Sequence, residues 1–206
     1  ICDLNYEEDK VQTLINDSKK IPILIGYVLR HESAFSILNS WLKKELIGIP
    51  IRAHFEYGSW LPYWRKDISF LKSVSANKSL GGGVLLELSH EIDCMLSIFG
   101  SCDVIGSSVS DTKTFNIDVE DRASLLVKTK NNLDITMQID FCTFPSYREI
   151  SIRGTNGTIN WNISKNSLEL VSNINENINL KKSFDPNQAF LNQLHHFFDC
   201  CLGNQK

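Results

Sequence analysis

Ionisable side chains are concentrated in one short stretch of this chain, residues 81–100. Glu87, His90 and Asp93 follow one another at intervals of three, and a helix places residues three apart on the same face. A histidine between two acids can accept or donate a proton near neutral pH, so this stripe could act as a general acid and base. The same pattern is also typical of a solvated helix face that carries a lone histidine.

The apolar residues of this stretch predict one amphipathic helix. Gly81–Gly83 open it and Gly100 closes it, where a helix-ending glycine is expected. Glycines lack a side chain, so another group can come close to the backbone at the start of the helix. The unpaired N–H groups there favour the binding of an anion. Cys94 and Ser97 are expected on the polar face. Six apolar side chains share the opposite face, spaced at about 100° per residue: Leu85, Leu88, Ile92, Met95, Leu96 and Phe99.

Length and composition indicate one globular domain. The chain has 206 residues, of which 42% are hydrophobic and 22% charged. Its net charge of -3 gives no reason to expect nucleic-acid binding, and no apolar run approaches the roughly 20 residues of a membrane span. No signal peptide is recognisable at the start. The six cysteines show no CxxC spacing, which predicts reduced thiols in a cytoplasmic protein.

The elements that must position the stripe are predicted from hydrophobic periodicity. Helices are expected over residues 3–20, where Val11, Leu14 and Ile15 would be buried, and over 33–44 and 187–202. Turns are expected at 131–132 and 154–157, and residues 60–78 form an aromatic loop. The fold class is therefore α+β, a large, mainly antiparallel open sheet with helices packed on one face. Strands are expected over 21–28 (buried), 49–57, 104–109, 121–129, 133–141, 147–153, 158–161 and 167–171.

Residues 81–93 resemble the motif GGG-x-L-x-D-x-x-x-H-x-x-D of the C-terminal domain of the Gfo/Idh/MocA oxidoreductases. These are NAD(P)-dependent enzymes that act mostly on sugars and cyclitols. The resemblance implies that His90 lies beside the carbon that exchanges hydride and helps to move the hydroxyl proton, with Asp93 as a second acid. The family acid stands four residues before the histidine, which is Leu86 here, whereas Glu87 stands three before it. Glu87 and Asp93 are expected to contact the substrate.

Residues 26–33 resemble the family segment G-Y-N-x-R-F-x-P. Arg30 matches its arginine, which implies that Arg30 faces the substrate or cofactor. Val28, His31 and Ser33 replace the usual Asn, Phe and Pro. A surface ion pair between Arg30 and Glu32 is an equal alternative.

The loop before the glycines resembles a family branch associated with surface-polysaccharide and nucleotide-sugar chemistry. Trp60 and Trp64 have the rigid aromatic faces that stack on sugar rings or cover a nicotinamide, and Lys78 is a candidate for binding a substrate phosphate or carboxylate. Ile68, Ser69 and Val74 replace a Tyr, an Arg and a Tyr of that branch. A loop packed down by its own aromatic residues is equally compatible with the pattern.

The resemblance implies that residues 1–206 are a single substrate-binding and oligomerisation domain, excised from a longer chain with an N-terminal Rossmann domain. That domain would bind NAD or NADP and end in a Glu-Lys-Pro motif with a catalytic Lys. This fragment alone is then expected to bind no cofactor tightly and to be inactive. The partners implied are a sugar or nucleotide-sugar substrate and further copies of the chain, held through the sheet face.

Two other hypotheses remain open. The altered pocket positions fit a non-catalytic binding or oligomerisation module of the same fold. A metal site is suggested by His195 with Asp199 and by His196 with Cys200 in the last helix, but no second ligand cluster supports it, so no metal is expected. Arg148 could reach the pocket or be an ordinary strand charge.

Overall fold

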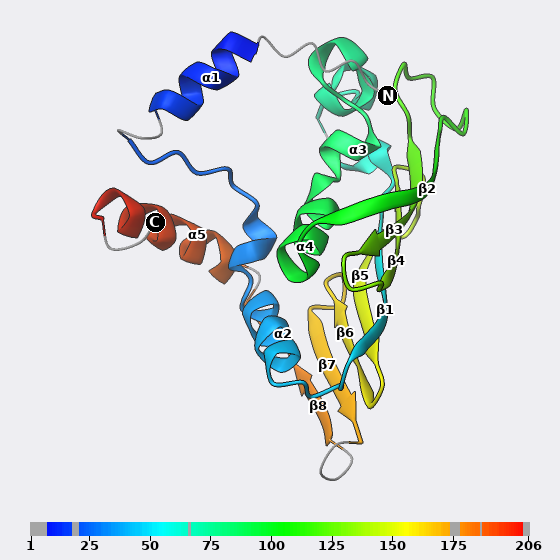
Figure 1. Cartoon of the computed structure of the whole chain (residues 1–206). Helices are drawn as coiled ribbons and strands as arrows, with labels where there is room; N and C mark the ends of the chain where they lie inside the picture. The colour runs from blue at the N-terminus through cyan, green and yellow to red at the C-terminus, as the bar shows by residue number, and fades with distance from the viewer. Residues whose placement is uncertain (1–7, 18–20, 66, 174–177, 186, 204–206) are drawn as a thin grey trace.

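An eight-stranded sheet carries helices on one of its faces (Figure 1). The computed structural model describes residues 8–17, 21–65, 67–173, 178–185 and 187–203. The strand order is β2-β3-β4-β1-β5-β6-β7-β8, and every neighbouring pair is antiparallel except β1 with β4. The strands are β1 Pro50–Gly58, β2 Cys102–Ser110, β3 Arg122–Thr129, β4 Asp134–Asp140, β5 Tyr147–Gly154, β6 Gly157–Asn162, β7 Ser167–Ser172 and β8 Ile178–Lys182.

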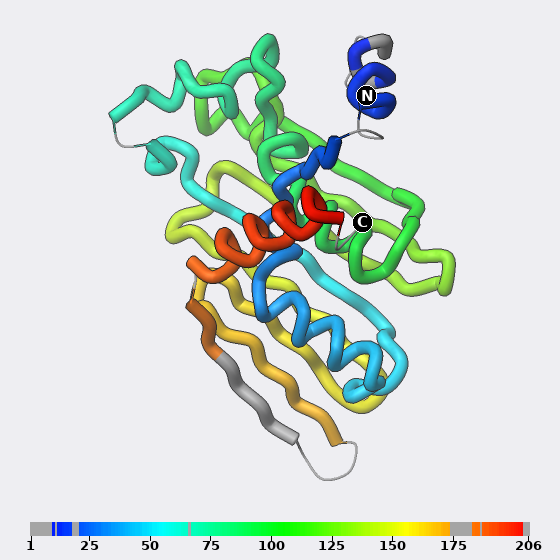
Figure 2. Tube along the Cα trace, turned by 90° about the vertical axis from the view of Figure 1, so that its left-hand side faces the viewer, coloured from blue at the N-terminus to red at the C-terminus, as the bar shows by residue number. Residues whose placement is uncertain are grey.

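The helices lie on one side of the sheet, and the first of them, α1, stands apart from it (Figures 1 and 2). None of the described helices is both long and apolar enough to cross a membrane. The α-helices are α1 Glu8–Asp17, α2 Ser33–Lys43, α3 Val84–Glu87, α4 Ser89–Phe99 and α5 Gln188–Cys201. Short 3-10 helices are η1 Val28–His31, η2 Leu61–Tyr63, η3 Phe70–Lys72, η4 Val74–Ala76 and η5 Lys78–Leu80.

The core follows from the two-residue alternation of the strands. In β4, Ile135, Met137 and Ile139 are each 0% exposed, whereas Thr136 and Gln138 face outward. The α+β prediction, with helices on one face, is confirmed. Strand β8 was not predicted.

The predicted strand over residues 21–28 is wrong. Residues 21–27 form no strand, and Ile21, Ile23 and Ile25 are 58%, 47% and 75% exposed. A β-branched apolar run forms a strand only beside another strand, and this segment lies on the helix side, away from the sheet (Figure 1). Its last residue, Val28, begins η1 instead.

The single helix predicted over residues 84–99 is interrupted at Leu88. This residue has φ -100° and ψ 27° and separates α3 from α4. Cys94 and Asp93, predicted on the polar face, are 0% and 7% exposed, whereas Leu96 is 42% exposed. The break changes the direction in which α4 points its side chains, so the buried side of α4 is not the face that one continuous helix would bury.

Helices α1 and α5 are where they were predicted, but their apolar residues are not covered. In α1, Leu14 and Ile15 are exposed; the side chain of Val11 and the predicted helix ends at residues 3–7 and 18–20 lie outside the described residues. Helix α5 lies across η1 beside residues 21–27 (Figure 2), and the Asn192 amide donates to the His31 carbonyl at 2.9 Å. Six large apolar side chains of residues 21–25 and helix α5 are exposed, and we call these six the apolar flank: Ile21, Ile23, Ile25, Phe190, Leu194 and Phe198.

Candidate functional site

A cavity of about 420 Å³ opens between residues 24–31, helix α4 and helix α5. Two residues predicted for the site, Arg30 and Asp93, lie in its wall. The full lining is Leu24, Ile25, Tyr27, Arg30, His31, Asp93 and His196.

Arg30 and Asp93 form a two-bond ion pair. The distance from Arg30 Nε to Asp93 Oδ2 is 2.7 Å, and from Arg30 Nη2 to Asp93 Oδ1 it is 2.6 Å. The hydrogen bond to Asp93 raises the pKa of Arg30. Among the described residues Arg30 does not pair with Glu32, whose own pKa is raised by burial. Because the Asp93 side chain is only 7% exposed and that of Arg30 is 47% exposed, the carboxylate holds the guanidinium at the cavity wall.

His90 does not line this cavity itself but contacts Tyr27, which does. Its ring meets that of Tyr27 edge-on, with 5.5 Å between the centroids. Its Nδ1 is buried and has no hydrogen-bond partner among the described residues, while the residue as a whole is half-buried. Burial lowers the pKa of His90, the positive charge of Arg148 lowers it further, and Asp93 opposes both. The imidazole is therefore neutral at neutral pH, the form that accepts a proton.

A second ion pair, which sequence reasoning missed, lies behind His90. Arg148 Nε is 2.6 Å from Glu91 Oε1, and the two side chains are 16% and 1% exposed. The Arg148 guanidinium carbon also lies 4.4 Å from the centroid of the Tyr57 ring. The sequence did contain a sign of this pair. Glu91 lies three residues after Leu88 and four before Met95, so it shares a helix face with these apolar residues.

Arg148 therefore ties strand β5 to helix α4, the helix that carries His90. Burial raises the pKa of the Glu91 carboxyl, and Arg148 counteracts that shift. Glu91 Oε2 and Arg148 Nη2 are buried without a hydrogen-bond partner in the part of the chain that the structure describes. Such a pair orients its helix, and breaking it leaves a buried charge.

The anion expected at the glycine-rich helix entrance belongs to the chain itself. The Leu85 N–H donates to Glu120 Oε1 at 3.3 Å, and the Val84 N–H donates to the Glu120 carbonyl at 3.1 Å. Gly83 has φ +112°, and a Cβ there would lie 2.4 Å from Glu120 Oε1. The glycine thus makes room for the side chain that occupies this helix end.

Gly83→Ala is expected to lower the free energy of unfolding by about 2–3 kcal/mol, because it adds strain at positive φ and displaces the Glu120 carboxylate. Gly81→Ala is the matched control, since Gly81 has φ +80° but nothing within 4 Å of its Cβ. Urea unfolding of both variants measures the difference. Equal losses in the two would show that the contact with Glu120 contributes nothing.

The two tryptophans pack against other aromatic rings. The Trp60 ring lies 5.0 Å from that of Phe115, and the Trp64 ring lies 5.2 Å from that of Phe141. Trp64 Nε1 donates to Ser59 Oγ at 2.9 Å. The hollow beside Trp64 holds only about 10 Å³. Neither indole lines the cavity beside Arg30, so their role in substrate binding stays a prediction.

Lys78 and Glu87 also lie outside the cavity lining. Lys78 is exposed, and its backbone N–H donates to Asp118 Oδ1 at 2.8 Å. Glu87 accepts a hydrogen bond of 2.6 Å from Ser75 Oγ. Their roles toward a substrate remain predictions.

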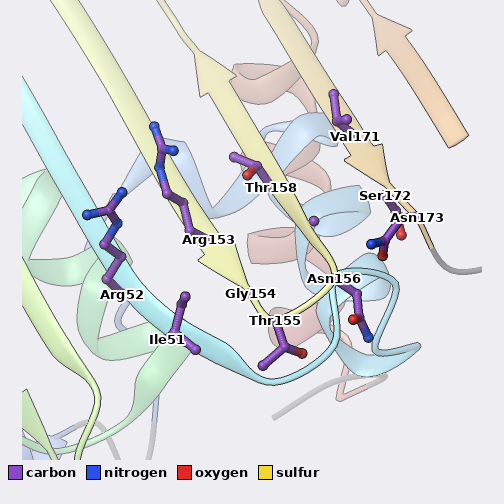
Figure 3. A pocket seen from close by; sticks show the side chains of 11 residues that line it. Ile51, Arg52, Arg153, Gly154, Thr155, Asn156, Thr158, Val171, Ser172 and Asn173 are labelled. Carbon is purple, nitrogen blue, oxygen red and sulfur yellow. The ribbon is translucent and has the colours of Figure 1, made fainter. Parts of the chain in front are cut away.

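A larger hollow of about 560 Å³ lies near the β5–β6 turn, on the sheet face opposite the helices (Figure 3). Arg52 and Arg153 line it, but it contains no acid or histidine that could move a proton. The smaller cavity, whose wall includes the Tyr27 ring in contact with His90, is therefore the candidate active site. Among the described residues no group of three His, Cys, Asp or Glu side chains is arranged to hold a metal ion; His196 Nε2 and Cys200 Sγ are 3.8 Å apart.

Comparison with known proteins gives a family and a fold. The family model of the GFO/IDH/MocA C-terminal domain matches residues 35–160, more than half of the chain. No curated protein gives a match.

Three solved structures share the fold at low sequence identity. Levoglucosan dehydrogenase in complex with NADH and levoglucosan is 16% identical, with a TM-score of 0.76 over 87% of this chain and 57% of that one. UDP-N-acetylglucosamine 3-dehydrogenase from Acidithiobacillus ferrooxidans is 13% identical, with a TM-score of 0.70 over 97% and 60%. A putative NADPH-dependent oxidoreductase from Desulfitobacterium hafniense is 13% identical, with a TM-score of 0.78 over 96% and 60%. The chain thus spans less than two thirds of each neighbour.

Proposed function

This chain belongs to the GFO/IDH/MocA family of oxidoreductases, and on that premise we propose that it is the substrate-binding domain of an NAD(P)-dependent dehydrogenase. Its substrate would be a sugar or nucleotide sugar that exchanges hydride at a secondary alcohol or ketone carbon. The observation that carries the proposal is the packing of His90, half-buried and with a lowered pKa, against Tyr27 in the wall of a cavity that also holds the Arg30–Asp93 pair. Neighbours of the same fold carry the names of a levoglucosan and a UDP-N-acetylglucosamine dehydrogenase, which supports this substrate class.

In this proposal His90 accepts the proton of the substrate hydroxyl as the alcohol is oxidised. Its Nδ1 is buried, so Nε2 is the nitrogen that meets the substrate. Arg30, held by Asp93, donates hydrogen bonds to neighbouring hydroxyl or phosphate oxygens and fixes the sugar in place. Bound NAD(P)⁺ would supply the hydride acceptor.

The cofactor would be held mainly by a domain outside this chain. No glycine-rich dinucleotide fingerprint follows a strand in the sequence, so the chain's own residues do not fit the pyrophosphate. The apolar flank, in contrast, fits a covering domain, because exposed clusters of large apolar side chains mark interaction surfaces. We place the whole protein in the cytoplasm, since its cysteine spacing shows no disulfide framework.

The test is to read the coding sequence upstream of Ile1 and to assay the product with and without that segment. We expect a strand–GxGxxG–helix unit that ends in Glu-Lys-Pro. Joined to it, the chain should reduce NAD⁺ or NADP⁺ with sugars or nucleotide sugars, measured as the absorbance of the reduced nicotinamide. The chain alone should show no turnover. Turnover by the chain alone would contradict the proposal.

A non-catalytic binding module is the second candidate. It is favoured by the packing of Trp60 and Trp64 against Phe115 and Phe141, which removes both indoles from the cavity wall. A joined protein that binds the cofactor but is inert on a broad panel of nucleotide sugars would establish this alternative.

A further inference from the structure

The candidate active site holds two histidines to which the proposed reaction gives no role. His31 belongs to η1 and His196 to α5, and both line the cavity beside Arg30. Their rings meet at a tilt of 44°, with 5.4 Å between the centroids. Both residues are half-buried, so the two rings form part of the cavity wall and are not free surface side chains.

Helix α5 packs closely on the segment that carries His31, which keeps the two histidines together. The Asn192 amide donates to the His31 carbonyl at 2.9 Å. One turn of chain earlier, a Cβ on Gly26 would lie 2.7 Å from Gln193 Nε2. Two consecutive residues of α5 therefore contact residues 26–31, and the ring pair is a built contact between the two segments.

The charges in the cavity wall leave it without an unpaired acid. Asp93 is the only acid among the described residues that line it, and Arg30 neutralises Asp93 through two hydrogen bonds. Those bonds use Nε and Nη2 of Arg30, whereas Nη1 has no hydrogen-bond partner among the described residues. The Arg30 side chain is also 47% exposed, so Nη1 can donate to a second anion.

Few other ionisable groups surround the two histidines in the described part of the chain. Next to His31, Glu32 lies outside the cavity lining; burial raises the pKa of its carboxyl, and Arg148 opposes that shift. On α5, Cys200 Sγ lies 3.8 Å from His196 Nε2, and Asp199 does not line the cavity. Residues 33–42 of α2 carry no charge. A ligand anion would therefore meet hydrogen-bond donors and no competing carboxylate.

A bound anion would change the protonation state of His31. Burial lowers the pKa of His31, and the positive charges of His196 and Arg30 lower it further, so the ring is neutral at neutral pH. An anion beside the ring acts in the opposite direction, because an opposite charge favours the protonated form. His31 would then take up a proton from solvent, and both of its ring nitrogens would become donors.

We propose that Arg30, His31 and His196 form an anion-binding subsite of the candidate active site, which holds a carboxylate or phosphate group of the substrate and takes up a proton as it does so. The inference rests on the proposed function, because it assigns a charged group to the sugar substrate. The carboxylate of a uronic acid and the diphosphate of a nucleotide sugar share this chemistry, since both present oxyanions that accept several hydrogen bonds.

The test is a titration of this chain with three sugars, read by NMR of the histidine ring protons. Glucuronate and UDP-glucose each carry an oxyanion, and glucose is the neutral match of glucuronate. At pH 6 we expect at least one of the two acids to bind about 10-fold or more tightly than glucose. Its Kd should rise about fivefold or more between pH 6 and pH 8, because the complex holds an additional proton that is lost as the pH rises.

The same spectra identify the group that is bound. Saturation with the acid that binds should raise the pKa of His31, whereas glucose should leave it unchanged. A preference for glucuronate would assign the subsite to a carboxylate, and a preference for UDP-glucose would assign it to the diphosphate.

Two variants of His31 separate charge from packing. His31→Phe keeps a ring in the wall but should weaken binding of the acid about 10-fold or more at pH 6, with no effect on glucose. His31→Gln keeps a hydrogen-bond donor but cannot titrate, so it should bind the acid with a Kd that changes less between pH 6 and pH 8. His195→Gln is the matched control, because His195 is an exposed histidine of the same helix that does not line the cavity.

Three results would overturn the subsite: acids that bind no more tightly than glucose, a Kd that is equal at pH 6 and pH 8, or a pH dependence that His31→Gln retains in full. None of these measurements uses the cofactor or turnover, so they are independent of the proposed dehydrogenase activity. A chain that binds the acid as expected but is inactive when joined to its upstream segment would contradict the proposed function alone. An active enzyme with none of these binding properties would contradict the subsite alone.

Discussion

Arg148→Met is expected to lower the free energy of unfolding by about 3–5 kcal/mol, because it leaves the Glu91 carboxylate buried without its partner. The Glu91 side chain is 1% exposed and its Oε1 lies 2.6 Å from Arg148 Nε. The loss should shrink as the pH falls: burial raises the pKa of Glu91 in the folded state, so protonation removes the unpaired charge. Urea unfolding at several pH values measures both effects.

The double variant Glu91→Leu with Arg148→Met is the control for this result. Replacing both members of a buried pair with apolar residues is often close to neutral, so most of the lost stability should return. A double variant as unstable as Arg148→Met would show instead that the stabilisation comes from Arg148 packing on Tyr57.

His90→Ala is expected to lower kcat/KM for alcohol oxidation by about 10²–10⁴-fold in the complete protein, because it removes the group that accepts the hydroxyl proton. Stability should change little, since His90 is half-buried and its Nδ1 has no described hydrogen bond. Initial rates of nicotinamide reduction measure the loss. His195→Ala, at an exposed position of α5, is the control and should keep the wild-type rate.

The pH profile separates a chemical role of His90 from a structural one. Burial and Arg148 lower its pKa, so the acidic limb of oxidation should lie below the ordinary histidine value of about 6.5. Titration of the His90 ring protons by NMR in this chain should report the same value. A limb that persists in His90→Ala, or a His90 pKa above the ordinary value, would contradict the assignment.

The sheet could be predicted because alternation is a local property. Ile135, Met137 and Ile139 reveal the inner face of β4 in the sequence alone, and the structure buries all three. Residues 21–28 are also rich in β-branched side chains, yet none of the described strands pairs with them. Such a run forms a strand only where another strand lies alongside it. The periodicity of the sequence carries no information about that neighbour.

Two residues of the cavity wall, Arg30 and Asp93, could be singled out from the sequence, but their pairing could not. Arg30 and Asp93 are 63 residues apart, and the sequence offered the nearby Glu32 as the simpler partner for Arg30. Glu91 and Arg148 are 57 residues apart, so an acid within an apolar stripe could be noticed without its cation being identified. Ion pairs between such distant residues depend on how α4 crosses the sheet. The local sequence around either partner does not reveal that crossing.

The ion pair between α4 and β5 makes the two sides of the cavity differ in how firmly they are held. On one side, Glu91 and Arg148 fasten α4 to a strand in the middle of the sheet, and that wall cannot yield without breaking a buried ion pair. On the other side, residues 21–27 belong to no helix or strand and leave Ile21, Ile23 and Ile25 open to solvent. Local opening follows the weaker contacts, so we expect a ligand of this cavity to enter and leave on the second side, away from the helix that carries His90.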